Sequence, residues 1–347
     1  MGIEKQDFDR DYFAPLFQSL SLPNTKVVLA LGGGGVRMFA HAVVFEFLEK
    51  IGVSQYLSEV WGASGGALMA FAYSLGLTPD EMKKIGTVAF KGEIVPQMPS
   101  YMTLIKRIFV DIFSSSKESA SLQVFREYQR RLEKYLRKLA SERSQRCKFF
   151  CTGFNLETQE NDVLSSEVAS DCFGTDKVYQ VDNIDAVMAS SAVPILFEPR
   201  TISDKFGTRT YIDAALIEDV PTQSVYKKWI HDKELGIEKS RFLVMIAVNL
   251  YPSSFDSTNL LGNSRLRRLP GFEHVMMSLN CAEFMRQAAT KAQKKLLQQD
   301  PNVELWDLNI TIPNGSLLSL DLIPRVLEVA DEAVPLEFRK ICEKLIY

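Results

Sequence analysis

The stretch from residue 26 to residue 52 constrains the fold of this chain more than any other. A run of β-branched and apolar residues, KVVLAL (26–31), leads into four consecutive glycines. After the glycines, apolar residues recur at the spacing of one helical face, and Gly52 is a typical C-terminal stop. The stretch therefore predicts a buried strand, a glycine-rich turn and a helix, which is the unit from which parallel sheets are built.

The same order of strand, turn and helix recurs further along the chain. It begins at Leu57, passes through a second glycine turn and continues into the apolar run ALMAFAYSLG. Residues 121–140 predict another helix, because apolar positions share one face and Glu–Arg pairs lie four residues apart. Further strands are predicted at 147–156, 209–216, 241–250 and 303–308, and further helices at 276–298 and from Pro324. This alternation predicts an α/β fold, a three-layer sandwich with a mostly parallel central sheet covered by helices on both faces.

A single domain accounts for most of the chain. Its 347 residues, 46% of them hydrophobic, can enclose one sizeable core, and there is no repeat and no linker rich in Pro, Gly or Ser. We expect the domain to span residues 26–340 after a polar N-terminal leader, residues 1–25. The amphipathic pattern within residues 96–120 predicts either a helix packed on the sheet or a lid that opens at a lipid surface.

Composition and charge exclude several classes of protein. The net charge of −3 argues against a general nucleic-acid-binding protein. The five cysteines form no CxxC pair and no histidine lies at ligand spacing, which predicts free thiols in a reducing compartment and no structural zinc. Without a secretory signal or a run long enough to span a membrane, we expect a cytoplasmic protein that is peripheral at membranes. Residues 264–272 mix arginines with apolar side chains and predict either an anionic-lipid contact or a solvated loop.

Ser64 is the candidate nucleophile. Residues 62–66, GASGG, fit G-x-S-x-G, the pattern of a nucleophile elbow. A strand-to-helix corner holds such a serine in a strained conformation, and the small residues Gly62 and Gly66 avoid a clash where the chain doubles back. The helix that follows directs its N-terminal amides toward the oxyanion formed in the reaction. A tight turn that happens to contain a serine is the alternative.

The four glycines of GGGGVR (32–37) allow the backbone to come very near another group. A phosphate-binding loop is disfavoured, because G-x-G-x-x-G would need a glycine at Met38 and no Gly-Lys-Ser/Thr follows. An oxyanion hole uses the same physics, since its backbone N–H groups stabilise a developing negative charge. Arg37 would reinforce such a hole or lie solvated at the helix start. A tight turn between strand and helix is the remaining alternative.

Asp213 is the candidate base. In TYIDAALIEDVPT a predicted strand ends on this aspartate, which two small residues follow. The carboxylate would then lie at the carboxyl end of a strand, where the active sites of open α/β sheets are found. An ordinary helix cap explains the same residue equally well.

Four blocks of sequence, taken in order, resemble the patatin-like phospholipase family over roughly residues 26–340. LALGGGGVRMFAHAVVFEFLEKIGV is similar to the family's glycine-rich block, and VWGASGGALMA is similar to its serine elbow. AVMASSAVPILFEP (186–199) resembles its Ser-Ala-x-Pro segment, and YIDAALIEDVP stands where the family has an Asp-Gly-Gly/Ala stretch. Four ordered blocks are far more specific than any one of them.

The resemblance implies a lipid acyl hydrolase of the phospholipase A or lysophospholipase type, which cleaves carboxylic esters with a catalytic dyad and without a metal or other cofactor. Ser64 would be the nucleophile, Asp213 the base that activates it, and the backbone amides of Gly33, Gly34 and Gly35 the oxyanion hole. The partners would be a phospholipid or lysophospholipid substrate and, transiently, a membrane surface.

The chain departs from the family pattern at three positions. Met38 replaces a glycine, Ala214 follows the aspartate, and Asp219 replaces an asparagine. If Asp219 lies close to Asp213, its charge would raise the pKa of that carboxyl. These departures bear on substrate preference more than on the chemistry.

Two other functions stay open. A Ser-His-Asp esterase for small substrates would need one of the three histidines: His41 in the helix after the glycine loop, His231 in a charged, loop-like stretch, or His274 at the start of a late helix. None of them lies in a catalytic motif, and each is typical of a packing or surface histidine. The other function is that of a catalytically inactive protein that binds lipid or a partner.

Overall fold

The computed structural model describes residues 10–90, 120–167, 178–194, 197–204, 207–252, 286, 288–312 and 320–346. The strands are β1 (Thr25–Leu31), β2 (Leu57–Gly62), β3 (Lys148–Asn155), β4 (Glu160–Ser165), β5 (Val178–Gln180), β6 (Arg200–Asp204), β7 (Gly207–Asp213), β8 (Phe242–Pro252) and β9 (Val303–Ile312). The α-helices are α1 (Ala14–Leu20), α2 (Ala40–Ile51), α3 (Gly65–Ser74), α4 (Pro79–Phe90), α6 (Ala120–Ser141), α7 (Asn183–Ser190), α8 (Thr222–Glu234) and α10 (Ile323–Ile346). Short 3-10 helices are η1 (Arg10–Phe13), η2 (Gly35–Phe39), η3 (Ser54–Tyr56), η5 (Ala214–Leu216) and η7 (Leu320–Leu322).

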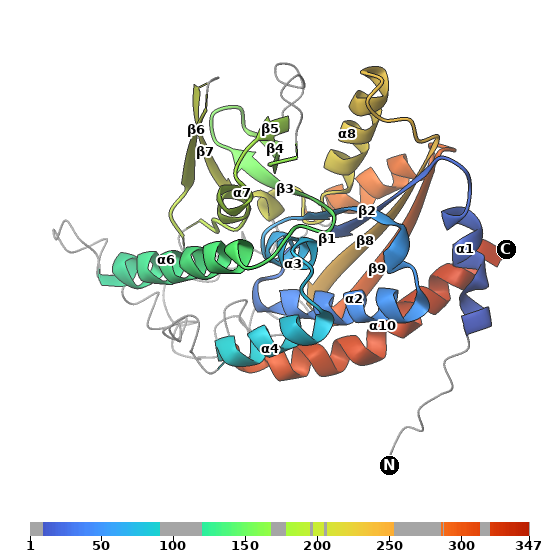
Figure 1. The fold of residues 1–347 in the computed structure, drawn as a ribbon, viewed down its shortest axis with the longest axis horizontal. Coiled ribbons are helices and arrows are strands. Elements are labelled where there is room, and N and C mark those ends of the chain that lie inside the picture. Colours follow the sequence, from blue (N-terminus) through green and yellow to red (C-terminus); the bar gives the residue numbers. More distant parts are fainter. Residues whose placement is uncertain are drawn as a thin grey trace, which may run out of the picture.

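The strands form one sheet with the order β5-β4-β3-β2-β1-β8-β9, and the β6–β7 hairpin joins it at β3 (Figure 1). The central strands are parallel: β1 pairs with β2 and β8, β2 pairs with β3, and β8 pairs with β9. In the described parts of the chain, antiparallel pairing is confined to β3–β4, β3–β7 and β6–β7. The predicted α/β architecture with a mostly parallel sheet is confirmed.

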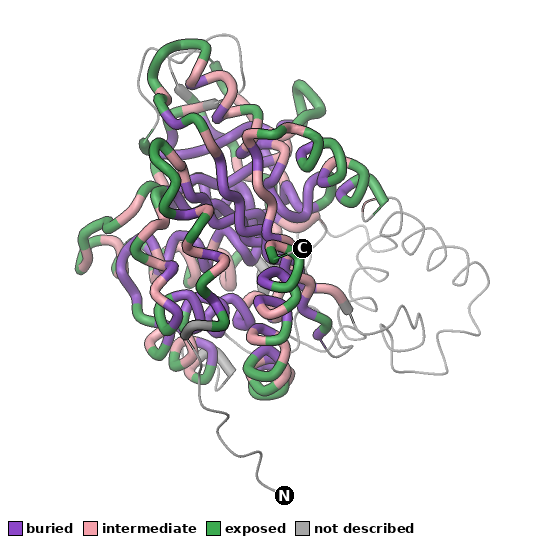
Figure 2. Tube along the Cα trace, turned by 90° about the vertical axis from the view of Figure 1, so that its right-hand side faces the viewer, coloured by how far each residue is buried: buried purple, intermediate pink, exposed green. Residues whose placement is uncertain are grey.

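Helices cover both faces of this sheet. Alternate side chains of β1 enter two different apolar clusters, Leu29 and Leu31 in one and Val28 and Ala30 in the other. Helices α2, α3, α7 and α10 pack against the first face, whereas α8 and the helical residues 288–297 pack against the second. In Figure 2 the buried stretches concentrate in the middle of the molecule, with exposed stretches around them. Burial on both faces explains the unbroken apolar runs of β1 and β8.

The N-terminal boundary differs from the expectation. Residues 10–20, expected to belong to a polar leader, form η1 and α1. Their side chains Phe13, Leu16 and Leu20 are buried in the main core. The sequence signal was weak, because α1 is only seven residues long and shows little more than one repeat of a helical period.

Three expectations fall wholly or largely outside the described residues. Except for Ala120, the predicted lid at 96–120 is among them. The arginine-containing stretch 264–272 and His274 are the other two.

His231 is described, and its expected environment was wrong: it lies within the helix α8, not in a loop. The charged stretch is helical because Val225 and Trp229 on its other side are buried against the sheet.

Candidate active site

Ser64 stands at the corner between the end of β2 and the start of α3. Its backbone has a φ of 55° and a ψ of −125°, a conformation that residues other than glycine seldom adopt. Such a strained residue persists only where the surrounding structure holds it, and strained residues concentrate at functional sites. The strand, corner and helix have the order that the G-x-S-x-G pattern predicted.

Gly62 and Gly66 leave the space that this corner needs. A Cβ on Gly62 would lie 2.3 Å from the backbone of Gly66, and a Cβ on Gly66 would lie 2.3 Å from the carbonyl oxygen of Leu31. Backbone atoms in a helix and a central strand cannot move aside, so neither position tolerates a side chain. Gly65 is less restricted: its Cβ would lie 3.0 Å from Cβ of Met38 and 3.1 Å from the carbonyl oxygen of Gly35.

The structure brings Ser64 and Asp213 into direct contact. The Ser64 hydroxyl donates a hydrogen bond of 2.5 Å to Oδ2 of Asp213, and the other carboxylate oxygen accepts 2.8 Å from the N–H of Ala215. Both side chains are buried, with exposed fractions of 7% and 4%. The strand β7 runs antiparallel to β3, with Asp213 opposite Gly153. Asp213 is the last residue of β7, as predicted, but because this strand is antiparallel, Asp213 reaches the site from the direction opposite to the parallel strands.

The end of α7 holds both members of this pair through their backbones. The N–H of Ser64 donates to the hydroxyl of Ser190 at 3.0 Å. The N–H of Asp213 donates to the carbonyl of Ala192, also at 3.0 Å. Motif reasoning assigned no role to Ser190, although the segment around it was among the blocks that carry the family resemblance. Its own signal was slight, since a serine near a helix end is usually an ordinary helix residue.

The pKa of the Asp213 carboxyl is raised to about 6, mainly because the group is buried. The hydrogen bonds from Ser64 and Ala215 act in the opposite direction. Asp219 raises this pKa further, as expected from its charge, but it contributes less than burial does. Arg286 offsets part of that effect, because its guanidinium lies 2.9 Å from the Asp219 carboxylate. The site therefore contains a carboxyl whose pKa lies well above the usual range of an aspartate.

We expect kcat/KM for a neutral, soluble ester to rise with pH through about 6 and then to level off. Below this pKa Asp213 carries a proton and cannot accept the one from Ser64; above it the carboxylate is available. The profile should be measured well below the melting temperature, because ionisation of a buried carboxyl with a raised pKa also lowers stability as the pH rises.

Asp162→Asn is the matched control for this profile. Asp162 is also a buried carboxyl whose pKa is raised to about 6 by burial, but its partners are Asn155 and Tyr211. Its removal should leave the rise in kcat/KM in place. A profile of the parent protein that stays flat across pH 6 would contradict Asp213 as the base.

The glycine loop lies beside the pair. A Cβ on Gly33 would come within 3.2 Å of the Ser64 side chain, so the loop and Ser64 are neighbours. The N–H of Gly33 donates to the carbonyl of Asp219 at 3.1 Å and is therefore engaged, contrary to its expected place in an oxyanion hole. Among the described residues, the amides of Gly34, Gly35 and Gly65 have no hydrogen-bond acceptor.

Arg37 and the described histidines have partners other than the Ser64–Asp213 pair. Arg37 is half-buried and its Nη1 lies 3.5 Å from the carbonyl oxygen of Leu250, so it packs toward β8 instead of lying solvated. His41 is fully buried with Nε2 at 2.9 Å from the carbonyl oxygen of Gly32. His231 belongs to α8, on the sheet face opposite α3. No histidine of the described chain therefore takes the place of a third catalytic residue.

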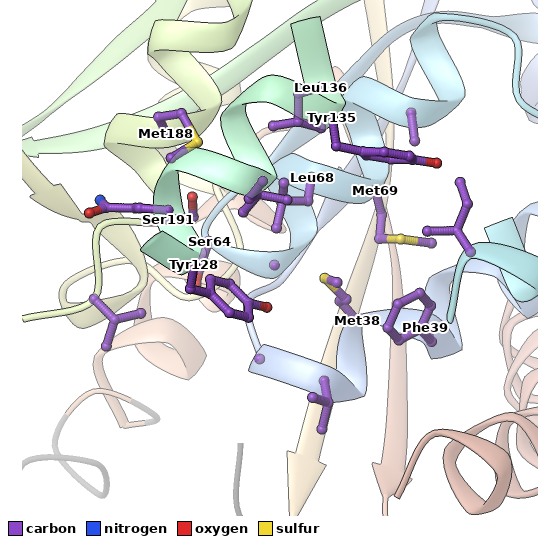
Figure 3. A pocket seen from close by; sticks show the side chains of 18 of the residues that line it. Met38, Phe39, Ser64, Leu68, Met69, Tyr128, Tyr135, Leu136, Met188 and Ser191 are labelled. Atoms are coloured by element: carbon purple, nitrogen blue, oxygen red, sulfur yellow. The ribbon is translucent and has the colours of Figure 1, made fainter. Parts of the chain in front are cut away.

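A cavity of about 150 Å³ opens beside Ser64. Its walls come mainly from η2, α3, α4 and α6 and are almost wholly apolar. In Figure 3, Ser64 lies near Tyr128 and Ser191, and Leu68 lies between it and the side chains of Met69 and Tyr135. Sealed apolar cavities of about this volume bind small hydrocarbons, and this open one has mostly the same kind of lining. The polar Ser64–Asp213 pair therefore borders an apolar space.

Ion pairs hold α6 over this cavity. Glu133 of α6 pairs with Arg200 of β6, which also pairs with Asp185 of α7. Because α7 carries Ser190, the cavity wall and the support of Ser64 belong to one connected group of elements.

The described residues contain no group of three or more His, Cys, Asp or Glu side chains that would hold a metal ion. Within the same residues, no helix has both the length and the apolar character needed to cross a bilayer.

A family model described as patatin-like phospholipase matches residues 29–226. Among solved structures, the chain is similar to human GIVD cytosolic phospholipase A2, with a TM-score of 0.47 and 11% identity over 97% of this chain and 63% of that one. It is also similar to VipD from Legionella pneumophila, with a TM-score of 0.41 and 13% identity over 92% of this chain and 67% of that one. For the type III effector protein ExoU the TM-score is 0.32 and the identity 11%, over 92% of this chain and 54% of that one.

The chain thus spans about two thirds or less of the length of these structures. A comparison with curated proteins found no match.

Proposed function

This chain belongs to the patatin-like phospholipase family, and we propose that it is a lipid acyl hydrolase that cleaves carboxylic esters of phospholipids or lysophospholipids with Ser64 as nucleophile and Asp213 as base. Family membership supports the coarser function, hydrolysis of lipid esters. The finer assignment rests on one observation, the 2.5 Å hydrogen bond from the Ser64 hydroxyl to Asp213 at the edge of an apolar cavity.

The first half of the reaction forms an acyl-enzyme. Asp213 takes the proton of the Ser64 hydroxyl while Oγ attacks the carbonyl carbon of the ester. The tetrahedral intermediate collapses when the bond to the alcohol oxygen breaks, and the proton held by Asp213 passes to that leaving group. In the second half, Asp213 takes a proton from water, the hydroxide attacks the acyl-enzyme, and the proton returns to Ser64 as the fatty acid leaves.

The negative charge of each tetrahedral intermediate needs donors that are already oriented. The amides of Gly34, Gly35 and Gly65 are the candidates, because no acceptor among the described residues engages them. Gly65 is the first residue of α3, so its N–H also lies at the positive end of the helix dipole. Removal of a single donor of this kind typically costs about 10²–10³ in kcat.

The apolar cavity would hold the acyl chain. Its walls bury hydrocarbon without offering it polar partners, which favours a fatty acyl group over a polar one. A substrate whose acyl chain enters this space places its ester at the cavity edge, where Ser64 lies.

The proposal is tested by labelling the purified protein with a fluorophosphonate and mapping the modified peptide, together with fatty-acid release from phospholipid and lysophospholipid micelles. We expect one phosphonylated residue, Ser64, and release of free fatty acid. A parent protein that neither reacts with the probe nor releases fatty acid, with and without detergent, would instead support a catalytically inactive lipid-binding protein.

The same assay separates the dyad from a Ser-His-Asp esterase. A dyad should keep its activity when His231 and His274 are both replaced by glutamine, because neither takes part in the chemistry. Loss of labelling in that double variant, with an unchanged melting temperature, would favour the esterase.

Ala72→Phe should shift acyl-chain preference toward shorter chains. Ala72 lines the cavity two helical turns beyond Ser64 on α3, about 12 Å along the helix axis, so a phenyl ring there fills the far part of the space. We expect kcat/KM for a long-chain ester to fall about tenfold or more relative to a butyryl ester, the usual size of such steric discrimination. An equal change for both esters, measured with one leaving group, would show that the chain does not occupy this space.

A further inference from the structure

We propose that His41 is a positioning residue: its Nε2–H holds the peptide group between Gly32 and Gly33, and thereby directs the amides that follow it toward the ester oxygen during the reaction. The inference rests on the proposed function, since it assigns a cause to the orientation of the proposed oxyanion donors. His41 touches neither the substrate nor the reacting atoms.

The contact itself determines the protonated nitrogen of His41. Its Nε2 lies 2.9 Å from the carbonyl oxygen of Gly32, and a carbonyl can only accept a hydrogen bond. The hydrogen is therefore on Nε2. His41 is completely buried in the first turn of α2, where the surrounding core leaves its ring no freedom to seek another partner.

The peptide group between Gly32 and Gly33 is held at both of its ends. Its carbonyl accepts from His41, and its N–H, which belongs to Gly33, donates to the carbonyl of Asp219 at 3.1 Å. A peptide group is planar, so these two bonds define the orientation of the whole plane. Two adjacent glycines would otherwise permit this plane to flip, because glycine adopts positive and negative φ with similar ease.

The held peptide lies against the nucleophile corner. A Cβ on Gly66 would lie 2.6 Å from the Gly32 carbonyl oxygen, so that oxygen sits between α3 and His41. On its other side the N–H of Gly32 donates to the carbonyl of Val248 at 2.9 Å. A rotation of this peptide would shift the next residues of the loop, which include the donors proposed at positions 34 and 35.

The second ring nitrogen argues against a role in proton transfer. Nδ1 of His41 is buried and has no hydrogen-bond partner among the described residues. Burial lowers the pKa of the imidazole to about 4, while the bond to Gly32 acts in the opposite direction, so the ring stays neutral near neutral pH. Burying an imidazole with one nitrogen unsatisfied is unfavourable for stability compared with an apolar side chain. What remains for His41 is to act as a neutral donor, with its Nε2–H directed at the carbonyl of Gly32.

The test compares two amide side chains that reach different distances. In His41→Gln the amide nitrogen is separated from Cα by as many bonds as Nε2 of histidine. In His41→Asn it is separated from Cα by only as many bonds as Nδ1. With a soluble ester we expect His41→Asn to lower kcat by about 10- to 100-fold with KM nearly unchanged, somewhat less than the loss of an oxyanion donor itself. His41→Gln should restore most of kcat, and His231→Asn should leave kcat unchanged. The rate of phosphonylation by a fluorophosphonate should follow the same order.

Nitrogen-15 NMR of the histidine side chains supplies a readout that does not depend on activity. The chain has only three histidines, so the signals missing in His41→Gln identify His41. We expect an Nε2–H tautomer that does not titrate between about pH 5 and 8. An Nδ1–H tautomer, or a full kcat in His41→Asn, would overturn the inference while leaving the proposed function intact. A parent protein without any hydrolysis would refute the proposed function, and the catalytic role of His41 with it.

Discussion

Ser64→Ala should abolish ester hydrolysis, with kcat reduced on the order of 10⁴-fold or more, because alanine has no group to form the acyl-enzyme. Asp213→Asn should cost nearly as much, since an amide accepts a hydrogen bond from Ser64 but cannot take its proton. The two residues act as one unit, so the double variant should be no less active than Ser64→Ala alone. The measurement is initial-rate kinetics on a soluble ester and on phospholipid micelles.

Ser74→Ala is the control for loss of a buried hydroxyl. Ser74 is fully buried at the other end of α3, and its hydroxyl donates only to the carbonyl of Phe71 in its own helix. Its removal should leave kcat unchanged and lower the melting temperature slightly. If Ser64→Ala kept more than about 1% of the parent kcat, another residue would have to be the nucleophile, since no solvent reaction replaces a lost acyl-enzyme at that level.

Gly66→Ala should prevent the chain from folding or reduce its stability by several kcal/mol. Alanine is the better helix former by about 1 kcal/mol, so intrinsic propensity alone predicts a gain in stability. The structure reverses that sign: the added Cβ would lie 2.3 Å from the carbonyl oxygen of Leu31 and 2.6 Å from that of Gly32. Relief requires α3 to move away from β1, and that would open the core beneath Ser64.

Gly236→Ala is the matched control for this substitution. Gly236 has a positive φ of 71°, but a Cβ there meets nothing within 4 Å. Its replacement should lower the free energy of unfolding by about 1 kcal/mol, which is the penalty for holding alanine at a positive φ. Soluble yield and thermal unfolding compare the two variants. If Gly66→Ala melted within a few degrees of Gly236→Ala, the close approach of α3 and β1 would not be as tight as described.

Much of the site followed from local sequence patterns. Residues 62–66 predicted a strand-to-helix corner, and Ser64 stands at such a corner with a positive φ. The spacing of Gly62 and Gly66 around the serine follows from the steric demands of the turn alone, and the distances that a Cβ would meet bear this out. These features depend on residues close together in the chain, which is why a short pattern carries them.

Other parts of the site could not be read from any single segment. The engagement of the Gly33 amide depends on the carbonyl of Asp219, which lies far along the chain and reaches the loop only after the sheet has formed. The support of Ser64 by Ser190 spans 126 residues. Asp219 and Ser190 both lie in or beside segments that carry the family resemblance, but no periodicity or motif shows that they contact the glycine loop and Ser64.

Local patterns of apolar residues and glycines predicted the central strands, the mostly parallel character of the sheet and the corner at Ser64, but not α7, α8 or the strands β4, β5 and β6. They also singled out Ser64 and Asp213 as candidate site residues. The tertiary structure decided which of these side chains meet. Ser64 and Asp213 are 149 residues apart, and they come within 2.5 Å because the antiparallel strand β7 adds to β3 in one register, with Asp213 opposite Gly153. It also decided that the carboxyl is buried, which raises the pKa of Asp213 to about 6. The pairing of β7 with β3 and the burial of Asp213 are products of long-range packing, and the local sequence around Asp213 specifies neither.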